Sequence, residues 1–287
     1  MTLEFTKMQG VGNDFVVVDG RGIADQDWSA LAIEVCDRKF GIGADGLLVI
    51  DFPTNSTADV LMRMFNPDGT PDICGNGMRC VARYAVEHKL VDPDSLWIET
   101  LAGMRIAIVY RDERGFIDKI TVGMGEPEFD PYKIPMLVGL RDEVLDYTLE
   151  LSDGTALSIS AVSTGSTHAI TFVPGLPDDS VFFAVSPLVE HHSQFPERTS
   201  LMWCVVDDPT HIRMRIWERG AGETLGCGTG ACAAAVAAIR LGYSPAGEAV
   251  TIATRGGELS IVWKPGESIE MTGPARTVFS GTYLVNE

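Results

Sequence analysis

The sequence lacks several features that would each define a class of protein. No apolar run approaches the roughly 18–20 residues that cross a bilayer, and the first residues show neither the basic nor the apolar part of a signal peptide. Basic residues are few: 22 lysines and arginines face 40 acidic residues, and the net charge of −18 repels nucleic acid and anionic membranes. We therefore expect a cytoplasmic protein that binds neither nucleic acid nor membrane.

Metal and phosphate signatures are also missing. The six cysteines include no Cys-x-x-Cys pair and have no histidines at ligand spacing, so no metal is expected. A Gly-x-x-x-x-Gly-Lys-Ser/Thr loop is absent, which leaves phosphate binding as a minor alternative. In a reducing cytosol the thiols should be free. Each cysteine is then core filler or part of the chemistry, and we assign to the core Cys36, Cys80, Cys204 and Cys232.

What the sequence does contain is an internal repeat. The motif Cys74-Gly75-Asn76-Gly77 is echoed by Cys227-Gly228-Thr229-Gly230. Gly12 and Gly165 each precede their cysteine by 62 residues, and Gly103 and Gly257 follow theirs by 29 and 30. Agreement at three anchors indicates two copies of one structural unit.

Each copy is predicted to combine strands with one central helix. The helices are expected over Met78–Lys89 and Ala231–Leu241. The second has no polar face, so it should be surrounded by sheet. β-Branched or alternating runs predict strands at Phe15–Asp19, Leu47–Ile50, Ile106–Val109, Ala169–Val173 and Leu259–Trp263.

The predicted organisation is two domains, since 287 residues with 45% hydrophobic content can form two cores. The N-terminal half is expected to cover 1–124, completed by 273–287, and the C-terminal half 125–272. The acidic stretch Glu126–Asp146 should be a solvent-exposed connection. The fold class is α/β (α+β): two pseudo-symmetric halves, each a curved sheet or barrel around a central helix, with the active site in the cleft between them.

The two repeated cysteines suggest the chemistry. A thiol at a helix start meets unpaired N–H groups and the positive end of the helix dipole, which favour its thiolate. The same N–H groups can hold a carboxylate, and the glycines let it approach. If Cys74 and Cys227 face one α-carbon, one removes the α-proton and the other returns a proton from the opposite side. A single cysteine at a helix start is more often core, but the repeated pair favours an amino-acid racemase or epimerase.

Three further residues attract attention near these motifs. His168 follows the Gly165 anchor, although an isolated histidine is often only a satisfied polar residue. Glu218 and Arg219 lie in a glycine-rich turn before Cys227. The turn is either a solvated loop or a site where Glu218 binds an ammonium group and Arg219 a second carboxylate.

The chain resembles the diaminopimelate epimerase family over nearly its whole length. The resemblance rests on the motifs at Lys7–Phe15, Phe40–Gly46, Phe65–Gly69, Cys74–Cys80 and Glu218–Ala231. It implies a two-half fold and two-cysteine acid–base catalysis, without pyridoxal phosphate or any other cofactor. The expected reaction interconverts LL- and meso-diaminopimelate for lysine and peptidoglycan synthesis. The oligomeric state stays open, and a homodimer is one option.

The resemblance also implies roles for individual residues. Those implied to hold the reacting carboxylate are Gly75, Asn76, Gly228 and Thr229. His168 and Glu218 are placed beside the reacting centre. Asn13, Asn66 and Arg219 are placed at the distal end of the substrate.

Two positions depart from the family pattern, because Ser166 and Ser200 stand where the family has asparagines that contact substrate. The substrate is therefore diaminopimelate or, as the alternative, another amino acid racemised without pyridoxal phosphate. A non-catalytic amino-acid-binding module is the third reading.

Overall fold

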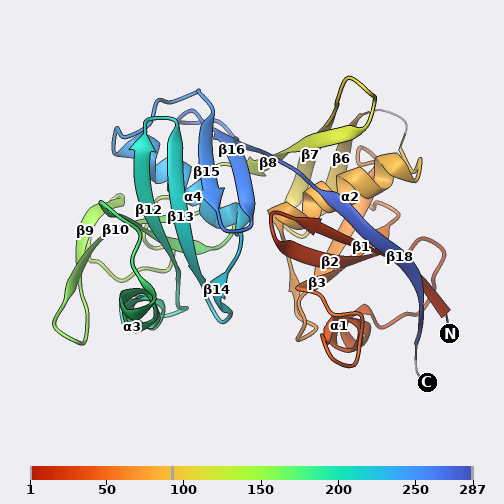
Figure 1. Ribbon diagram of the computed structural model, residues 1–287, viewed down its shortest axis with the longest axis horizontal. Coiled ribbons are helices and arrows are strands. Elements are labelled where there is room, and N and C mark those ends of the chain that lie inside the picture. The colour runs from red at the N-terminus through yellow and green to blue at the C-terminus, as the bar shows by residue number, and fades with distance from the viewer. Residues whose placement is uncertain (1, 92–93, 286–287) are drawn as a thin grey trace. The chain divides into compact units, whose positions relative to one another are not determined.

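The computed structural model describes residues 2–91 and 94–285, so residues 1, 92–93 and 286–287 of the predicted N-terminal half lie outside the described residues. The chain divides into two compact units (Figure 1). The N-terminal unit comprises residues 1–123 and 272–287, and the C-terminal unit comprises residues 124–271. Within the described ranges, no helix is long and apolar enough to cross a membrane.

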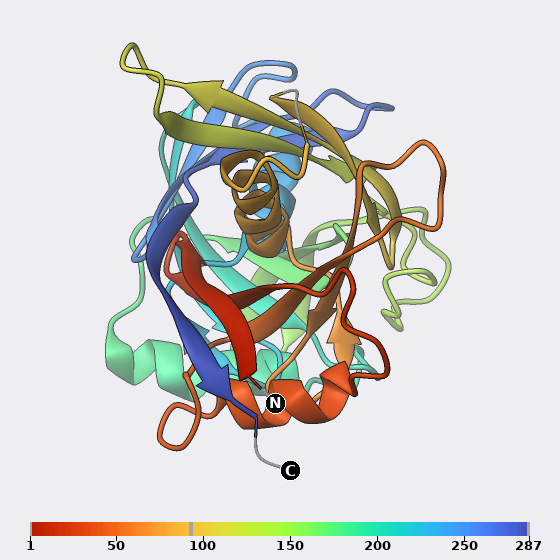
Figure 2. The same cartoon turned by 90° about the vertical axis from the view of Figure 1, so that its right-hand side faces the viewer.

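The N-terminal unit combines strands with helices α1 (Trp28–Cys36) and α2 (Gly75–Glu87). Its strands are β1 Thr2–Gly10, β2 Asn13–Asp19, β3 Gly46–Asp51, β4 Val60–Phe65, β5 Pro71–Asp72, β6 Ser95–Thr100, β7 Gly103–Arg111, β8 Ile117–Gly125 and β18 Arg276–Leu284. Strand β18, in blue, lies antiparallel beside β1, in red (Figure 2). A segment near the end of the chain thus belongs to the unit that begins it.

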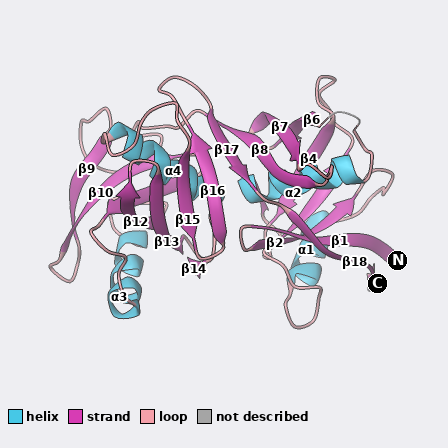
Figure 3. Cartoon of the chain, turned by 45° about the horizontal axis from the view of Figure 1, so that its top comes forward, coloured by secondary structure: helices cyan, strands magenta, loops and turns pink. Residues whose placement is uncertain are grey.

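The C-terminal unit combines strands with helices α3 (Asp179–Glu190) and α4 (Gly228–Arg240). Its strands are β9 Val144–Glu150, β10 Ala156–Ser163, β11 Thr167–Phe172, β12 Ser200–Asp208, β13 His211–Glu218, β14 Gly222–Thr224, β15 Val250–Thr254, β16 Gly257–Val262 and β17 Ile269–Gly273. Figure 3 shows the mixture of helix and strand in each unit.

Strand pairing follows one pattern in both units. In the N-terminal unit β1 is antiparallel to β2, β2 parallel to β3, β3 antiparallel to β4 and β4 parallel to β6. Strands β10, β11, β12, β13 and β15 pair in the same sequence of directions. Parallel neighbours need a long crossover, and a helix lies in each one. The predicted fold class, a mixed α/β protein of two pseudo-symmetric halves, is confirmed.

A helix lies at the centre of each unit. Helix α2 contacts β1, β2, β3, β4, β6 and β7, and α4 contacts the equivalent strands β10, β11, β12, β13, β15 and β16. In Figure 2 strands surround α2, which is seen nearly end-on. Almost every residue of α4 is buried, as its lack of a polar face predicts. The four cysteines assigned to the core are all buried.

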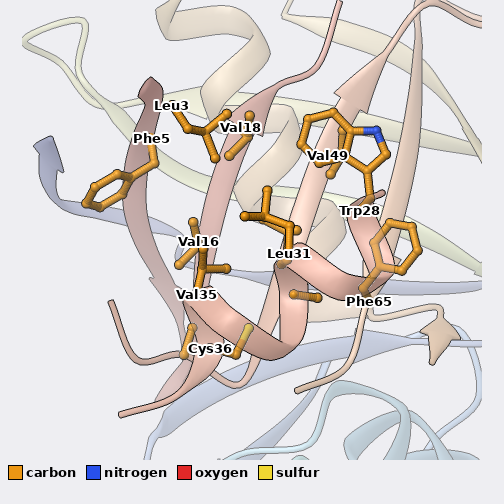
Figure 4. Close-up of a cluster of buried hydrophobic side chains, with 13 residues drawn as sticks. Leu3, Phe5, Val16, Val18, Trp28, Leu31, Val35, Cys36, Val49 and Phe65 are labelled. Atoms are coloured by element: carbon orange, nitrogen blue, oxygen red, sulfur yellow. The ribbon is translucent and has the colours of Figure 1, made fainter. Parts of the chain in front are cut away.

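The outer helix α1 packs on the other face of the N-terminal sheet. Its side chains Trp28, Leu31 and Val35 meet Val16 and Val49 of the neighbouring parallel strands (Figure 4). Helices α1 and α3 are not predicted from the sequence, because α1 has only nine residues and Pro187 interrupts the helical signal of α3. Their burial against the sheet provides what local propensity does not.

Several sequence-based boundaries are wrong. Helices α2 and α4 begin at Gly75 and Gly228, three residues earlier than predicted, because each cysteine is the residue that caps the helix. The stretch 126–146 is not simply an exposed connection, since Ile134 and Met136 are buried in the core of the C-terminal unit. The acidic residues around Ile134 and Met136 led to the prediction of an exposed segment, although these two side chains are apolar.

The loop after α1 caps that helix through its backbone. The N–H groups of Gly41, Ile42 and Ala44 donate to carbonyls of Asp37, Val35 and Cys36 at 2.9–3.1 Å. A Cβ at Gly41 would overlap the carbonyl oxygen of Glu34 and lie 2.9 Å from that of Val35. The glycine is therefore required by close backbone contact.

We predict that Gly41→Ala destabilises the protein by about 2 kcal/mol or more, because rigid carbonyls cannot move aside. Thermal unfolding should show a fall in Tm of about 5 °C. Gly175→Ala is the control, since a Cβ there meets nothing within 4 Å and should leave Tm nearly unchanged. Equal Tm values for the two variants would contradict the packing argument.

Candidate active site

Cys74 caps helix α2. Its backbone is extended (φ −143°, ψ 119°), and its Sγ accepts a hydrogen bond from the Gly77 N–H at 3.4 Å. The sequence folds this way because Gly75, Asn76 and Gly77 leave the first turn free of bulky side chains. The thiol is half-buried at the point where the unpaired N–H groups of the helix are concentrated.

Asn76 and Asn13 lie beside this thiol. Cys74 Sγ donates to Asn13 Oδ1 at 3.4 Å, and Asn76 Nδ2 donates to the same oxygen at 3.5 Å. The buried Arg79 donates from Nη2 to Asn76 Oδ1 at 2.8 Å and from Nε to the Pro274 carbonyl at 3.2 Å. Arg79 thereby fixes which end of the Asn76 carboxamide faces Cys74.

A network of charged side chains holds the Asn13 side chain in place through Asp45. Asp45 accepts from Asn13 Nδ2 at 2.7 Å, and Arg38 bonds both Asp45 and Asp14 at 2.7 Å. Lys7 pairs with Asp14 at 2.5 Å. Burial raises the pKa of Asp14, but hydrogen bonds from Arg38 and Lys7 outweigh it and lower that pKa to about 2. These supporting residues were missed, although all belong to the motifs at Lys7–Phe15 and Phe40–Gly46 or the adjoining helix end.

Asn66, which was also predicted to belong to the site, makes its side-chain hydrogen bonds away from Cys74. Its Nδ2 donates to Thr70 Oγ1 and Asp72 Oδ2, both at 3.2 Å. These bonds hold the turn between β4 and β5. The structure therefore gathers Asn13, Cys74, Gly75 and Asn76, with Asn66 on a neighbouring turn.

Cys227 caps helix α4 in the same way as Cys74 caps α2. Its backbone has φ −129° and ψ 113°, and its Sγ accepts from the Gly230 N–H at 3.4 Å. Thr229 Oγ1 lies 3.4 Å from the sulfur. The thiol is 6% exposed. Gly228 and Thr229 form the first turn, as Gly75 and Asn76 do in the other unit.

The prediction that both helix starts lower the thiol pKa is wrong for Cys227. Burial raises the pKa of Cys227 well above its usual value, and the charge of Glu218 adds to the rise. Hydrogen bonds from Thr229 and Gly230 act in the opposite direction without outweighing it. A helix start lowers the pKa of a thiol and burial raises it, and the sequence does not reveal how deeply Cys227 is buried. Cys227 is accordingly a thiol near neutral pH.

His168 and Ser166 lie close to this thiol. Ser166 Oγ is 3.1 Å from His168 Nε2 and 3.5 Å from Thr229 Oγ1. Burial, followed by the charge of Arg219, lowers the pKa of His168 to about 3. The imidazole is therefore neutral.

Glu218, Arg219 and Ser200 meet at the end of β13. Glu218 Oε1 accepts from Thr224 Oγ1 at 2.5 Å. The Arg219 N–H donates to Ser200 Oγ at 3.1 Å, and Arg219 Nη1 donates to the Glu197 carbonyl at 3.0 Å. Ser200 thus supports the backbone of the residue beside it.

A residue missed by sequence reasoning holds this turn in place. Glu190, buried at the end of α3, accepts from the Trp217 Nε1–H at 2.7 Å and the Gly220 N–H at 2.8 Å. These bonds flank Glu218 and Arg219. A glutamate within an amphipathic helix gives no sequence signal for such a role.

Solved structures with this fold come from several isomerases and related proteins. A probable proline racemase from Agrobacterium radiobacter superposes with a TM-score of 0.73 and 16% identity, covering 99% of this chain and 93% of that one. A phenazine biosynthesis protein of the PhzF family from Bacillus anthracis has a TM-score of 0.69 and 18% identity, covering 99% and 100%. The chain therefore has the two-half α/β fold of the proline racemase and PhzF proteins.

Closer relatives define the family. The diaminopimelate epimerase family model matches residues 5–129 and 160–278. A diaminopimelate epimerase from Pelotomaculum thermopropionicum is 45% identical over 284 residues, covering 98% of this chain and 99% of that one. One from Desulfovibrio desulfuricans is 44% identical over 292 residues, covering 99% of both. The chain belongs to the diaminopimelate epimerase family and is an isomerase.

We predict that Glu218→Gln increases the rate at which iodoacetamide alkylates Cys227. Removing the charge that raises the pKa of this thiol should increase its thiolate fraction, by about threefold at pH 8. The rate is read from the Cys227 peptide by mass spectrometry. Glu223→Gln is the matched control, because Glu223 pairs with Arg215 and Arg255 instead. If Glu218→Gln reacts no faster than the control, the charge of Glu218 does not raise the pKa of Cys227.

Proposed function

We propose that this protein interconverts LL- and meso-diaminopimelate by moving protons between the α-carbon and two cysteines, without a cofactor. The observation that carries the proposal is the equivalence of Cys74 and Cys227 as caps of two central helices. Family membership supports the substrate. The product serves lysine and peptidoglycan synthesis, and we place the enzyme in the cytoplasm.

The helix starts supply the binding site for the reacting carboxylate. Backbone N–H groups of Gly75 and Asn76, and of Gly228 and Thr229, point along the axes of α2 and α4 and favour an anion. In the transition state, negative charge spreads from the α-carbon onto this carboxylate. Fixed N–H donors stabilise that charge more than they stabilise the ground state.

The two thiols exchange roles with the direction of reaction. Because burial and the charge of Glu218 raise the pKa of Cys227, we assign Cys227 as the thiol that donates, and the mechanism then requires Cys74 to act as the thiolate that accepts. The Cα–H bond breaks as Cys74 gains the proton, and a new Cα–H bond forms on the opposite face as the Cys227 S–H bond breaks. The reverse reaction starts with the proton on Cys74. The chemistry requires the sulfurs to stand on opposite faces of the bound α-carbon.

The distal end of the substrate is assigned to Asn13, Asn66 and Arg219, with Ser166 and Ser200 in place of asparagines. A serine hydroxyl reaches less far than a carboxamide and offers one donor instead of two. Both hydroxyls also have partners within the protein. We infer a weaker distal grip than in relatives with asparagines, with water filling the gap.

Two alternatives remain as outcomes of experiment. The altered distal residues favour, as a second candidate, a racemase acting on another amino acid. A non-catalytic binding module, the third candidate, would not need a thiol at the start of each central helix. Exchange of the α-hydrogen with D₂O distinguishes the enzymes from the binder, because only proton transfer introduces deuterium.

We predict that Cys74→Ala and Cys227→Ala each reduce epimerisation of LL-diaminopimelate at least about 1,000-fold, since either change removes the proton carrier for one face. Conversion is followed by chiral chromatography. Cys80→Ala, a core thiol inside α2, is the control that should keep most activity. Substantial activity in either capping-thiol variant would rule out the two-base mechanism.

We predict that Ser200→Asn improves kcat/KM for diaminopimelate by about tenfold, mainly through KM, because a carboxamide restores a distal contact. On single-centre amino acids such as lysine, the same variant should be no faster than the wild type. If the wild type prefers a single-centre amino acid and Ser200→Asn gains nothing on diaminopimelate, the alternative racemase is the better assignment.

A further inference from the structure

Four side chains of the C-terminal unit form a continuous line of hydrogen-bonding atoms. His168 Nε2 lies 3.1 Å from Ser166 Oγ, which lies 3.5 Å from Thr229 Oγ1, which lies 3.4 Å from Cys227 Sγ. His168 and Ser166 come from the start of β11 and the turn before it. Thr229 and Cys227 come from the start of α4. The line therefore connects a strand to the thiol that caps the central helix.

The protonation state of His168, at the buried end of this line, determines which atom donates in each hydrogen bond. His168 is 1% exposed and neutral, so one of its ring nitrogens carries a proton and the other does not. Among the described residues, Nδ1 has no hydrogen-bond partner. A buried N–H without an acceptor is the rarer defect, so the proton belongs on Nε2, where Ser166 Oγ accepts it. The Ser166 hydroxyl is then free to donate onward.

A hydroxyl is required at position 166 for this arrangement. One serine oxygen accepts from His168 and donates its own proton to Thr229, which can donate in turn to Cys227. A carboxamide accepts on one atom and donates from another. The asparagine expected from the family resemblance could not accept from His168 and donate to Thr229 through the same atom.

We propose that Ser166 is a positioning residue that orients the Thr229 hydroxyl toward Cys227 and so stabilises the Cys227 thiolate. This inference rests on the proposed function. When Cys227 gives its proton to the α-carbon, the S–H bond breaks, the new C–H bond forms and the sulfur keeps the electron pair. The Thr229 O–H then donates to that sulfur, and no proton moves along the line.

Two charged groups nearby act alongside this chain. Burial opposes the ionisation of Cys227 and Glu218 on β13 adds to this effect, and burial keeps His168 neutral with a smaller contribution from Arg219. The Gly230 N–H also donates to the sulfur. Substitutions at Ser166 leave all three groups in place, so a change in the ionisation of Cys227 reports on the hydroxyl chain.

The test compares Ser166→Ala with Ser166→Thr by the pH dependence of Cys227 alkylation with iodoacetamide, read by peptide mass spectrometry. Ser166→Ala should move the Cys227 midpoint upward by about half a pH unit, because Thr229 Oγ1 loses the hydroxyl that donates to it and orients it. Ser166→Thr keeps a hydroxyl and should retain the wild-type midpoint. The Cys74 midpoint, measured in the same samples, should not change.

A double-mutant cycle with Thr229→Val separates a relayed effect from a general disturbance. Thr229→Val removes the direct donor and should shift the Cys227 midpoint by more than Ser166→Ala. Adding Ser166→Ala to Thr229→Val should then produce no additional shift. Additive shifts, or a Ser166→Ala midpoint equal to that of the wild type, would overturn the proposal.

These measurements need no substrate, so they are independent of the proposed function. If the wild type fails to epimerise diaminopimelate, the proposed function fails while the midpoint shifts still decide whether the chain exists. If it epimerises the substrate and Ser166→Ala shows no shift, only the role of Ser166 fails.

Discussion

The hydrogen bond from a helix N–H to a capping cysteine sulfur is the interaction on which the candidate site depends. It occurs at 3.4 Å in both units, from Gly77 to Cys74 and from Gly230 to Cys227. It fixes each sulfur at the end of a helix that packs against six strands of its own unit. Because the helices are held by their sheets, the position of each thiol is set by the core of its own unit rather than by a mobile loop.

The two caps have become different through their surroundings. Asn13 stands beside Cys74 and is supported by ionic contacts, whereas Thr229 and Glu218 stand beside Cys227. Five residues after each cysteine, the first copy has the buried Arg79 and the second the buried Cys232. A repeated backbone thus provides two equivalent helix-capping thiols, and unrepeated side chains give each thiol different neighbours.

Much of this arrangement could be predicted from the sequence, because the Cys-Gly-x-Gly repeat indicates the pseudo-symmetry and places both helix starts to within three residues. The all-apolar face of α4 likewise reports that strands surround it. Short helices such as α1 could not be predicted, since tertiary burial and not local propensity stabilises them. The ionisation of Cys227 could not be predicted either, because it depends on burial and on Glu218, which only the folded chain brings to the sulfur. The roles of Glu190 and Arg38 depend on long-range contacts in the same way.

The pairing of β1 with β18 bears on how the chain folds during synthesis. The first strand leaves the ribosome early, but its partner emerges only after the whole C-terminal unit. Until then one edge of β1 presents unpaired N–H and C=O groups, the kind of edge that recruits strands from other chains. The C-terminal unit, which is continuous in sequence, can fold while that edge waits. A molecular chaperone that covers β1 during synthesis would therefore limit strand pairing between nascent chains.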